Sequence, residues 1–244
     1  MQRIYAHRGA SGYAPENTLE AFELAASMGA DGVELDVHVA KDGELVVAHD
    51  EAVDRVANGS GLICRMTTAE LKRLRFNKTH PEYENATIPT LREVFELLKP
   101  TGLKINVELK NSYIVYENLE EKCLKLADDM GMSDRILYSS FNHHSMLRMK
   151  AIDPSIPCGL LYEATMIESW NYAHRLGVNA IHPHFSELQV KDEVSHAHAL
   201  GLDVNVWTVN DEADIVNCLR AGADIIIGNY PDRAIRLRDA MAGD

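Results

Sequence analysis

The stretch Asp31-Gly32-Val33-Glu34-Leu35-Asp36-Val37-His38 alternates apolar and polar side chains over the length of a short β-strand. Successive side chains of a strand point to opposite faces, so its three valine and leucine side chains share one face, while Glu34, Asp36 and His38 share the other. Two carboxylates on one face of a strand repel each other unless something compensates their charge. The stretch alone supports two hypotheses: an edge strand whose polar face meets water, or a cation bound between Glu34 and Asp36.

Short apolar runs alternate with longer helical patterns on both sides of this strand. Eight strands are predicted at approximately 4–7, 32–39, 104–109, 135–139, 157–162, 179–183, 203–208 and 224–227. Eight helices are predicted at approximately 18–28, 90–98, 115–130, 143–151, 164–176, 187–200, 211–221 and 231–241. Asn17, with Glu20 three residues later, has the capping-box spacing and is predicted to cap the first helix.

Three glycine phrases join a predicted helix to the next strand, namely Met28-Gly29-Ala30-Asp31, Leu176-Gly177-Val178-Asn179 and Ala221-Gly222-Ala223-Asp224. Their recurrence among eight strand–helix units predicts an α/β fold, a (β/α)₈ TIM barrel. A doubly wound open sheet is the alternative, but it offers no place for eight similar units. The alternation lapses at about 50–88, after a short predicted strand at 45–48. We therefore expect a single domain over residues 1–244, with a small insertion after the second strand.

The composition limits the classes of partner. The 244 residues carry a formal net charge of −13, which argues against nucleic acid and anionic membrane surfaces, because both attract clustered Lys and Arg. A small anionic substrate stays compatible, since a metal or a few basic residues can reverse the field inside a cleft. The four cysteines are scattered and no apolar run reaches the length of a membrane span. We expect a cytoplasmic protein without a signal peptide, and no pattern specifies its oligomeric state.

Polar residues gather at the predicted carboxyl ends of the strands, where a barrel of this type carries its chemistry. These ends hold His7-Arg8, Glu34 and Asp36, His49-Asp50, Glu108-Leu109-Lys110, Ser139-Ser140-Phe141, His182-Pro183-His184 and Trp207-Thr208-Val209-Asn210. One such coincidence carries little weight, but its recurrence around one barrel predicts a shared site.

The residue types in this predicted site fit one class of chemistry. Three carboxylates suit one divalent hard cation, Mg²⁺ or Ca²⁺. Basic side chains suit phosphate oxygens, and histidines transfer protons near neutral pH. The set contains Glu34, Asp36 and Glu108 as metal ligands, Arg8 and Lys110 as cations, and His7 and His49 as proton-transfer groups. Together they predict metal-assisted hydrolysis of a phosphate ester, with the substrate left open. A metal-dependent sugar isomerase, another barrel class, would not need the two cations beside two histidines.

Several phrases in order and spacing resemble the glycerophosphodiester phosphodiesterase family along nearly the whole chain. They are His7-Arg8-Gly9, Pro15-Glu16-Asn17-Thr18, Glu34-Leu35-Asp36-Val37, Lys41-Asp42-Gly43, Val47-Ala48-His49-Asp50, Ile88-Pro89-Thr90-Leu91, Asn106-Val107-Glu108-Leu109-Lys110, Ser139-Ser140-Phe141, Val206-Trp207-Thr208-Val209-Asn210 and Pro231-Asp232. Each phrase alone is weak, whereas their shared order is specific. The resemblance implies a TIM barrel with an insertion after the second strand, as the pattern predicts.

The resemblance also implies an activity, the hydrolysis of a small glycerophosphodiester to sn-glycerol 3-phosphate and an alcohol. In the family, a glycerol hydroxyl near the metal can act as internal nucleophile before water completes the reaction. The implied roles are a divalent cation on Glu34, Asp36 and Glu108, an acid–base pair in His7 and His49, phosphate binding by Arg8 and Lys110, and a pocket lined by Phe141 and Trp207.

The chain departs from the family pattern at its last strand, where Gly228-Asn229-Tyr230 stands in place of a Thr-Asp before Pro231-Asp232. We expect this to alter a minor hydrogen bond and not the metal site. His38 is expected to be solvated or to lie behind the metal ligands, and His184 to line the pocket mouth. Two other functions remain: a phospholipase-type phosphodiesterase of the same barrel that acts on lipid, and a non-catalytic phosphate- or metal-binding relative, which should lack His7 or His49.

Overall fold

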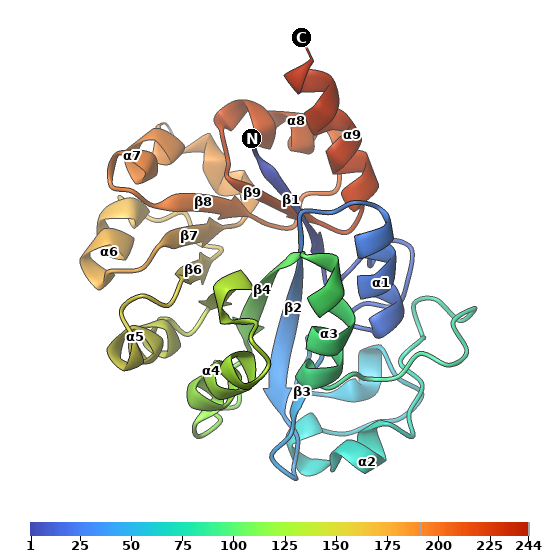
Figure 1. Ribbon diagram of the computed structural model, residues 1–244. Coiled ribbons are helices and arrows are strands. Elements are labelled where there is room, and N and C mark those ends of the chain that lie inside the picture. Colours follow the sequence, from blue (N-terminus) through green and yellow to red (C-terminus); the bar gives the residue numbers. More distant parts are fainter. Residues whose placement is uncertain (191, 244) are drawn as a thin grey trace.

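Within residues 1–190 and 192–243, the part of the chain that the computed structural model describes, eight parallel strands close into a barrel. They are β1 (Arg3–His7), β2 (Gly32–Val39), β4 (Lys104–Leu109), β5 (Ile136–Ser140), β6 (Cys158–Tyr162), β7 (Ala180–Pro183), β8 (Asp203–Val206) and β9 (Ile225–Gly228). β1 pairs with β2 on one side and with β9 on the other, which closes the sheet. The predicted (β/α)₈ TIM barrel is confirmed (Figure 1).

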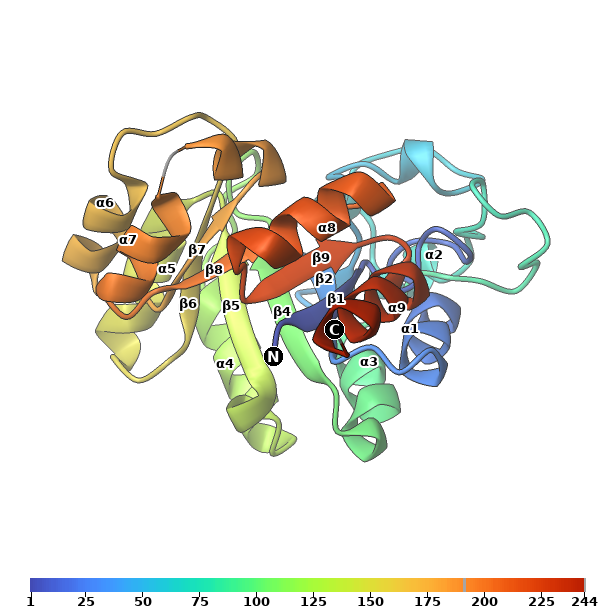
Figure 2. The same cartoon turned by 90° about the horizontal axis from the view of Figure 1, so that it is seen from above.

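Helices follow the strands and surround them, as the view from above shows (Figure 2). They are α1 (Leu19–Ser27), α3 (Leu91–Leu98), α4 (Leu119–Asp129), α5 (His143–Ile152), α6 (Ser169–Leu176), α7 (Glu193–Ala199), α8 (Glu212–Ala221) and α9 (Pro231–Ala242). The main apolar core lies between these helices and the outward faces of the strands. Among the described residues, no helix is both long and apolar enough to cross a membrane.

Strand β2 is buried along its whole length. Its three apolar side chains between Gly32 and His38 belong to the core under the helices, so the alternating polar side chains face the barrel interior. β2 pairs with β1 on one side and with β4 on the other. The edge-strand hypothesis is therefore wrong, and the buried carboxylates of Glu34 and Asp36 need compensation inside the protein.

Four sequence-based predictions about helices differ from the structure. The helices predicted at 115–130 and 164–176 begin later, as α4 at Leu119 and α6 at Ser169, because the preceding Asn118 and Glu168 have φ values of 58° and 54°. Thr18, not Asn17, caps α1, because its side chain accepts from the backbone N–H of Ala21. Asn17 is instead buried with a φ of 57°, and its Nδ2 donates to Asp36 Oδ2 at 2.8 Å. The single helix predicted at 187–200 is also wrong: a 3₁₀ turn (Phe185–Gln189) precedes α7, and Asp192 has a φ of 63°, which no continuous right-handed helix contains. Residue 191 of that prediction lies outside the described residues.

The segment between β3 (Leu45–Val47), which pairs antiparallel with β2, and α3 folds into short turns. These are η1 (Val53–Arg55), η2 (Ile63–Arg65) and α2 (Thr68–Leu71). Their apolar side chains form a small separate cluster with residues of β3 and with Phe76 and Ile88. In Figure 1 this segment, in cyan and teal, lies at the side of the barrel beside α3. We call residues 50–88 the insertion.

Candidate active site

The loop after β1 places two polar side chains at the barrel mouth. His7 ends the strand, and Arg8 and Gly9 follow with φ values of 56° and 80°, both in the left-handed region. A Cβ on Gly9 would lie 2.6 Å from the backbone carbonyl carbon of Ala21, so only glycine lets this loop pack against α1. The strained turn aims the backbone N–H of Arg8 at Glu34 Oε2, 3.1 Å away.

The predicted metal ligands come together on two neighbouring strands. Glu34 and Asp36 lie on β2, and Glu108 lies opposite Asp36 in the parallel register of β2 and β4. One carboxylate oxygen from each residue lies within 4.8 Å of those of the other two. The three residues are 4%, 1% and 8% exposed, so water screens the repulsion among their carboxylates poorly.

Two basic side chains compensate part of this charge. Lys110 Nζ lies 2.9 Å from Glu108 Oε1 and 3.6 Å from Asp36 Oδ1, while Arg8 Nε lies 3.5 Å from Asp36 Oδ2. Burial would raise the pKa of Asp36, but Lys110 and Arg8 outweigh it and hold that pKa well below its usual range. Burial and the other two carboxylates raise the pKa of Glu34, and burial, opposed by Lys110, raises that of Glu108.

The cluster has the donors and the charge that a divalent cation needs. Three carboxylates and two cations leave one net negative charge, and a divalent cation would leave one net positive charge for a phosphate anion. Asp36 Oδ1 is buried and has no hydrogen-bond partner among the described residues, which suits an oxygen reserved for a metal. Hard oxygen donors of this kind fit Mg²⁺ or Ca²⁺.

His7 is held in one tautomer. Its Nδ1 lies 2.7 Å from Asn229 Oδ1, which can only accept, so Nδ1 carries the proton and Nε2 keeps a lone pair. Nε2 lies 3.5 Å from Thr208 Oγ1 and 3.9 Å from Glu34 Oε2. Burial and the neighbouring Arg8 lower the pKa of His7 to about 3, so the ring is neutral near pH 7.

Asn229 therefore has a larger role than the minor contact expected from its departure from the family pattern. It follows β9 at the barrel mouth, and its backbone N–H donates to Asn210 Oδ1 at 2.8 Å. The preceding Gly228 also has a packing reason, because a Cβ there would lie 2.2 Å from the carbonyl oxygen of Val209. The position of Asn229 at a strand end was the available signal in the sequence.

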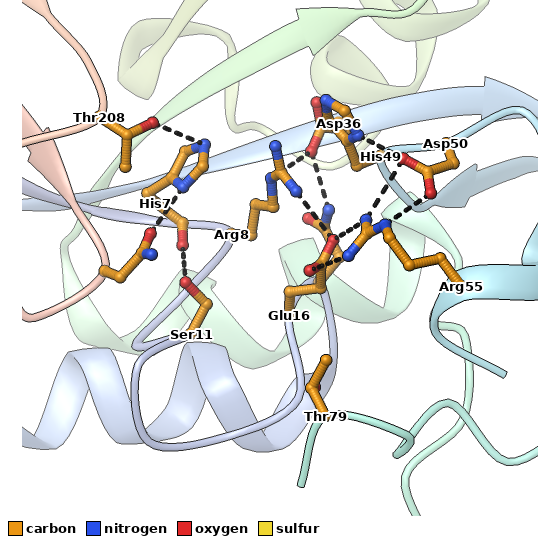
Figure 3. Close-up of polar contacts among 12 residues, drawn as sticks. His7, Arg8, Ser11, Glu16, Asp36, His49, Asp50, Arg55, Thr79 and Thr208 are labelled. Carbon is orange, nitrogen blue, oxygen red and sulfur yellow. Dashed lines mark hydrogen bonds and ion pairs between the residues drawn. The ribbon is translucent and has the colours of Figure 1, made fainter.

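His49 is fixed from the opposite side of the site (Figure 3). Its Nδ1 lies 2.6 Å from Asp50 Oδ1, and its backbone carbonyl lies 3.1 Å from His38 Nε2. His38 is fully buried, and its other ring nitrogen lies 3.0 Å from the Tyr116 hydroxyl. His38 therefore lies behind the site, where it holds the backbone of His49.

A cavity of about 60 Å³ lies among these groups. Phe141 and Trp207 form its aromatic wall, with ring centroids 5.5 Å apart at nearly right angles, and His184 packs on Trp207 at 5.4 Å. The lining consists of His7, Arg8, Glu34, His49, Asn106, Glu108, Phe141, Leu161, Trp207, Thr208 and Ile227. Asp36 and Lys110 do not line the cavity, but both contact residues that do.

Four lining residues received no role from the sequence: Asn106, Leu161, Thr208 and Ile227. Asn106 lies two residues before Glu108 on β4 and shares its face, so strand alternation was the available signal. Its Oδ1 is buried without a hydrogen-bond partner in the described part of the chain.

A larger cavity of about 520 Å³, next to α4 and α5, is lined by neither histidine nor arginine. The convergence of charged groups, not cavity size, identifies the site.

The chain is similar to known proteins over almost its whole length. Residues 7–233 match the Glycerophosphoryl diester phosphodiesterase family. A glycerophosphodiester phosphodiesterase of Caldanaerobacter subterraneus subsp. tengcongensis is 38% identical over 96% of this chain and 96% of the relative. Another, of Bacillus altitudinis, is 40% identical over 99% of this chain and 100% of the relative. The structure of an Oleispira antarctica phosphodiesterase in complex with the product sn-glycerol-3-phosphate has a TM-score of 0.86 at 33% identity, covering 98% of this chain and 97% of that chain.

Proposed function

The chain belongs to the glycerophosphoryl diester phosphodiesterase family, and from this membership we propose that its barrel pocket hydrolyses glycerophosphodiesters to sn-glycerol 3-phosphate and an alcohol. One observation carries the proposal: two carboxylates, one cation and two oriented histidines line one small cavity, and Asp36 and Lys110 contact these lining groups. The product complex of the Oleispira antarctica relative supports the same substrate class. The cavity of about 60 Å³ suits a small substrate group.

Glu34, Asp36 and Glu108 would hold one divalent cation, Mg²⁺ or Ca²⁺. The bound cation supplies Lewis-acid polarisation of a phosphoryl oxygen and of a nearby hydroxyl. Arg8 and Lys110 bind the remaining phosphate oxygens, because both already lie against the carboxylate cluster and carry positive charge. Phe141 and Trp207 contact the carbon skeleton of the substrate.

His7 acts as the general base and His49 as the general acid in the first step. His7 Nε2 accepts the proton of a glycerol hydroxyl, and the oxygen of that hydroxyl attacks phosphorus. This assignment rests on the neutral ring of His7, whose Nδ1–H donates to Asn229 Oδ1. The bond from phosphorus to the alcohol oxygen breaks, and His49 donates a proton to that oxygen. A water molecule then opens the cyclic phosphate with the two histidine roles reversed, which restores both rings.

The positions of both histidines support an enzyme over a non-catalytic relative, because each ring is fixed by a dedicated partner, Asn229 for His7 and Asp50 for His49. The charge of −13 and the small cavity weigh against a phospholipase that acts on an anionic membrane surface. A cytoplasmic location is also part of the proposal. Four cysteines without a disulfide among the described residues support it.

A substrate panel tests the proposal. Metal-stripped protein is supplied with Mg²⁺ or Ca²⁺ and incubated with glycerophosphocholine, glycerophosphoethanolamine or glycerophosphoglycerol, and released glycerol 3-phosphate is measured enzymatically. We expect release from at least one substrate with one of the two ions and no release in excess chelator. Absence of release from all three substrates with either ion would reject the proposed reaction.

A further inference from the structure

Arg55 lies outside the pocket, yet its side chain contacts Asp50 and Glu16, which in turn contact the pocket residues His49 and Arg8. It is the last residue of η1 in the insertion. Its neighbours Val53 and Val56 are buried in the insertion's own apolar cluster, which fixes the backbone of Arg55. The side chain then leaves this cluster and points toward the barrel mouth (Figure 3).

The guanidinium of Arg55 bridges two carboxylates from different parts of the chain. Nη1 and Nη2 donate to Glu16 Oε2 and Oε1 at 2.7 and 2.6 Å. Nε and Nη2 donate to Asp50 Oδ2 and Oδ1 at 2.7 and 3.3 Å. Paired donors on both partners make this a geometrically specific contact and not a chance surface ion pair, although the side chain is partly exposed. A lysine could not reproduce it, because an ammonium has no planar fork.

Each bridged carboxylate also contacts a residue of the proposed chemistry. Asp50 Oδ1 is the atom that lies 2.6 Å from His49 Nδ1. Glu16 Oε1 is the atom that accepts from Arg8 Nη1, at 2.9 Å. Arg55 therefore reaches the proposed general acid, His49, through Asp50. It reaches the proposed phosphate-binding cation, Arg8, through Glu16, and so connects the two.

Without Arg55, both partners would change in a defined way. Glu16 would keep Arg8 as its one ion-pair partner among the described residues, and would compete more strongly with phosphate for the Arg8 guanidinium. Asp50 would lose the donors that fix its carboxylate, so the hydrogen bond that orients the His49 ring would lose its support. The first change raises KM and the second lowers kcat.

We propose that Arg55 is a positioning residue that holds His49 through Asp50 and Arg8 through Glu16, and so makes catalysis depend on the folded insertion. The inference deepens the proposed function and rests on it. Because outer partners of active groups are worth about 10- to 100-fold in activity, R55A should lower kcat/KM by about that factor. R55K keeps the charge without the fork and should recover only part of the loss.

The structure provides a matched control variant. Further variants separate the contact of Arg55 with Asp50 from its contact with Glu16. Arg65 ends the insertion's other 3₁₀ turn, is exposed, and makes no ion pair within the described residues, so R65A should keep wild-type kcat and KM. D50N should reproduce the loss in kcat. In an E16Q background R55A should no longer raise KM, because the neutral side chain no longer competes with phosphate for Arg8. In an H49A background, R55A should cause no further loss in kcat, whereas a merely structural role would lower kcat again by the same factor.

The assays use full-length protein with Mg²⁺, together with melting temperatures to confirm that the variants fold. Wild-type kcat and KM in R55A, or an undiminished effect of R55A on kcat in the H49A background, would overturn the inference. Failure of the wild type to release glycerol 3-phosphate would instead reject the proposed function. In that case the ring signals of His49 in ¹H–¹⁵N spectra still decide the positioning role: R55A should move them and R65A should not.

Discussion

The tautomer and charge of His7 depend on Asn229, and N229D changes that partner without changing its shape. The variant places a carboxylate where an amide oxygen now lies 2.7 Å from His7 Nδ1. A full opposite charge favours the imidazolium, so the pKa of His7 should rise. The same substitution restores the acidic residue of the family pattern at this position, and it isolates the effect of charge from that of hydrogen bonding.

The structure gives the size of this effect. With the two charge centres about 4 Å apart and an effective dielectric constant of about 20, the attraction is about 4 kcal/mol. Each 1.4 kcal/mol or so changes a protonation equilibrium tenfold, so the pKa of His7 should rise from about 3 to about 6. In the wild type a pKa of about 3 keeps the ring neutral near pH 7. In N229D it should become protonated, and lose its function as base, as the pH falls through about 6.

Histidine ring NMR of metal-free protein measures this pKa directly, and the pH dependence of kcat/KM with metal measures its consequence. The acid limb of the profile should move to higher pH in N229D. N229A is the control, because it removes the acceptor without adding charge and should not raise the pKa of His7. A pKa of His7 in N229D that stays near 3 would refute the electrostatic reasoning.

The same shift has a predictable sign in stability. The wild-type ring resists protonation in the folded state while the unfolded chain takes up a proton below its ordinary pKa of about 6.5. His7 therefore lowers the free energy of unfolding as the pH falls from about 6.5 toward 3. A raised pKa in N229D should weaken this acid sensitivity, which urea denaturation at pH 7 and pH 4.5 would reveal.

Three further variants test separate parts of the structure. H49A should lower kcat by about 100-fold or more with an unchanged melting temperature, and an unchanged kcat would remove His49 from the mechanism. E34Q removes one charged ligand and should raise the Mg²⁺ concentration needed for half-maximal activity by about 100-fold, whereas an unchanged requirement would place the metal elsewhere. T90A breaks the capping box in which Thr90 and Glu93 bond each other's backbone N–H at the start of α3. It should lower the free energy of unfolding by about 1 kcal/mol without altering kcat, and equal stability in urea would contradict the role of the cap.

Features of the structure were predictable from the sequence where the interacting residues lie close together along the chain. The period-two pattern of β2 placed Glu34 and Asp36 on one face, and the helix predicted at 90–98 matches α3, because both signals are local. The prediction that Asn17 caps α1 was wrong, because the neighbouring Thr18 is also a good capping residue and takes that position. A buried contact with Asp36, 19 positions away, decides between the two residues, and local sequence does not contain that contact.

The contact between His7 and Asn229 and the contact between Arg55 and Glu16 show the same limit more sharply. Asn229 lies 222 positions from His7, and Arg55 lies 39 positions from Glu16, so neither contact leaves a periodic or local signal. Barrel closure brings β9 beside β1 and thereby Asn229 beside His7. The fold class was predictable from recurring units, whereas the contact of Asn229 with His7 follows only from the closed structure.

The two halves of the site are stabilised by different parts of the protein. The carboxylates of Glu34, Asp36 and Glu108 project from the paired strands β2 and β4, so the barrel's own hydrogen-bond ladder holds them at fixed spacing. His49 and Arg8 instead lie on loops, and carboxylates that Arg55 bridges from the insertion hold their side chains. A perturbation that loosens the insertion's apolar cluster should therefore spare the metal-ligand geometry and impair proton transfer and phosphate binding first. Rigid strands suit the groups that must hold a cation against mutual repulsion, and loops tied by a charge network suit the groups that must meet and release substrate.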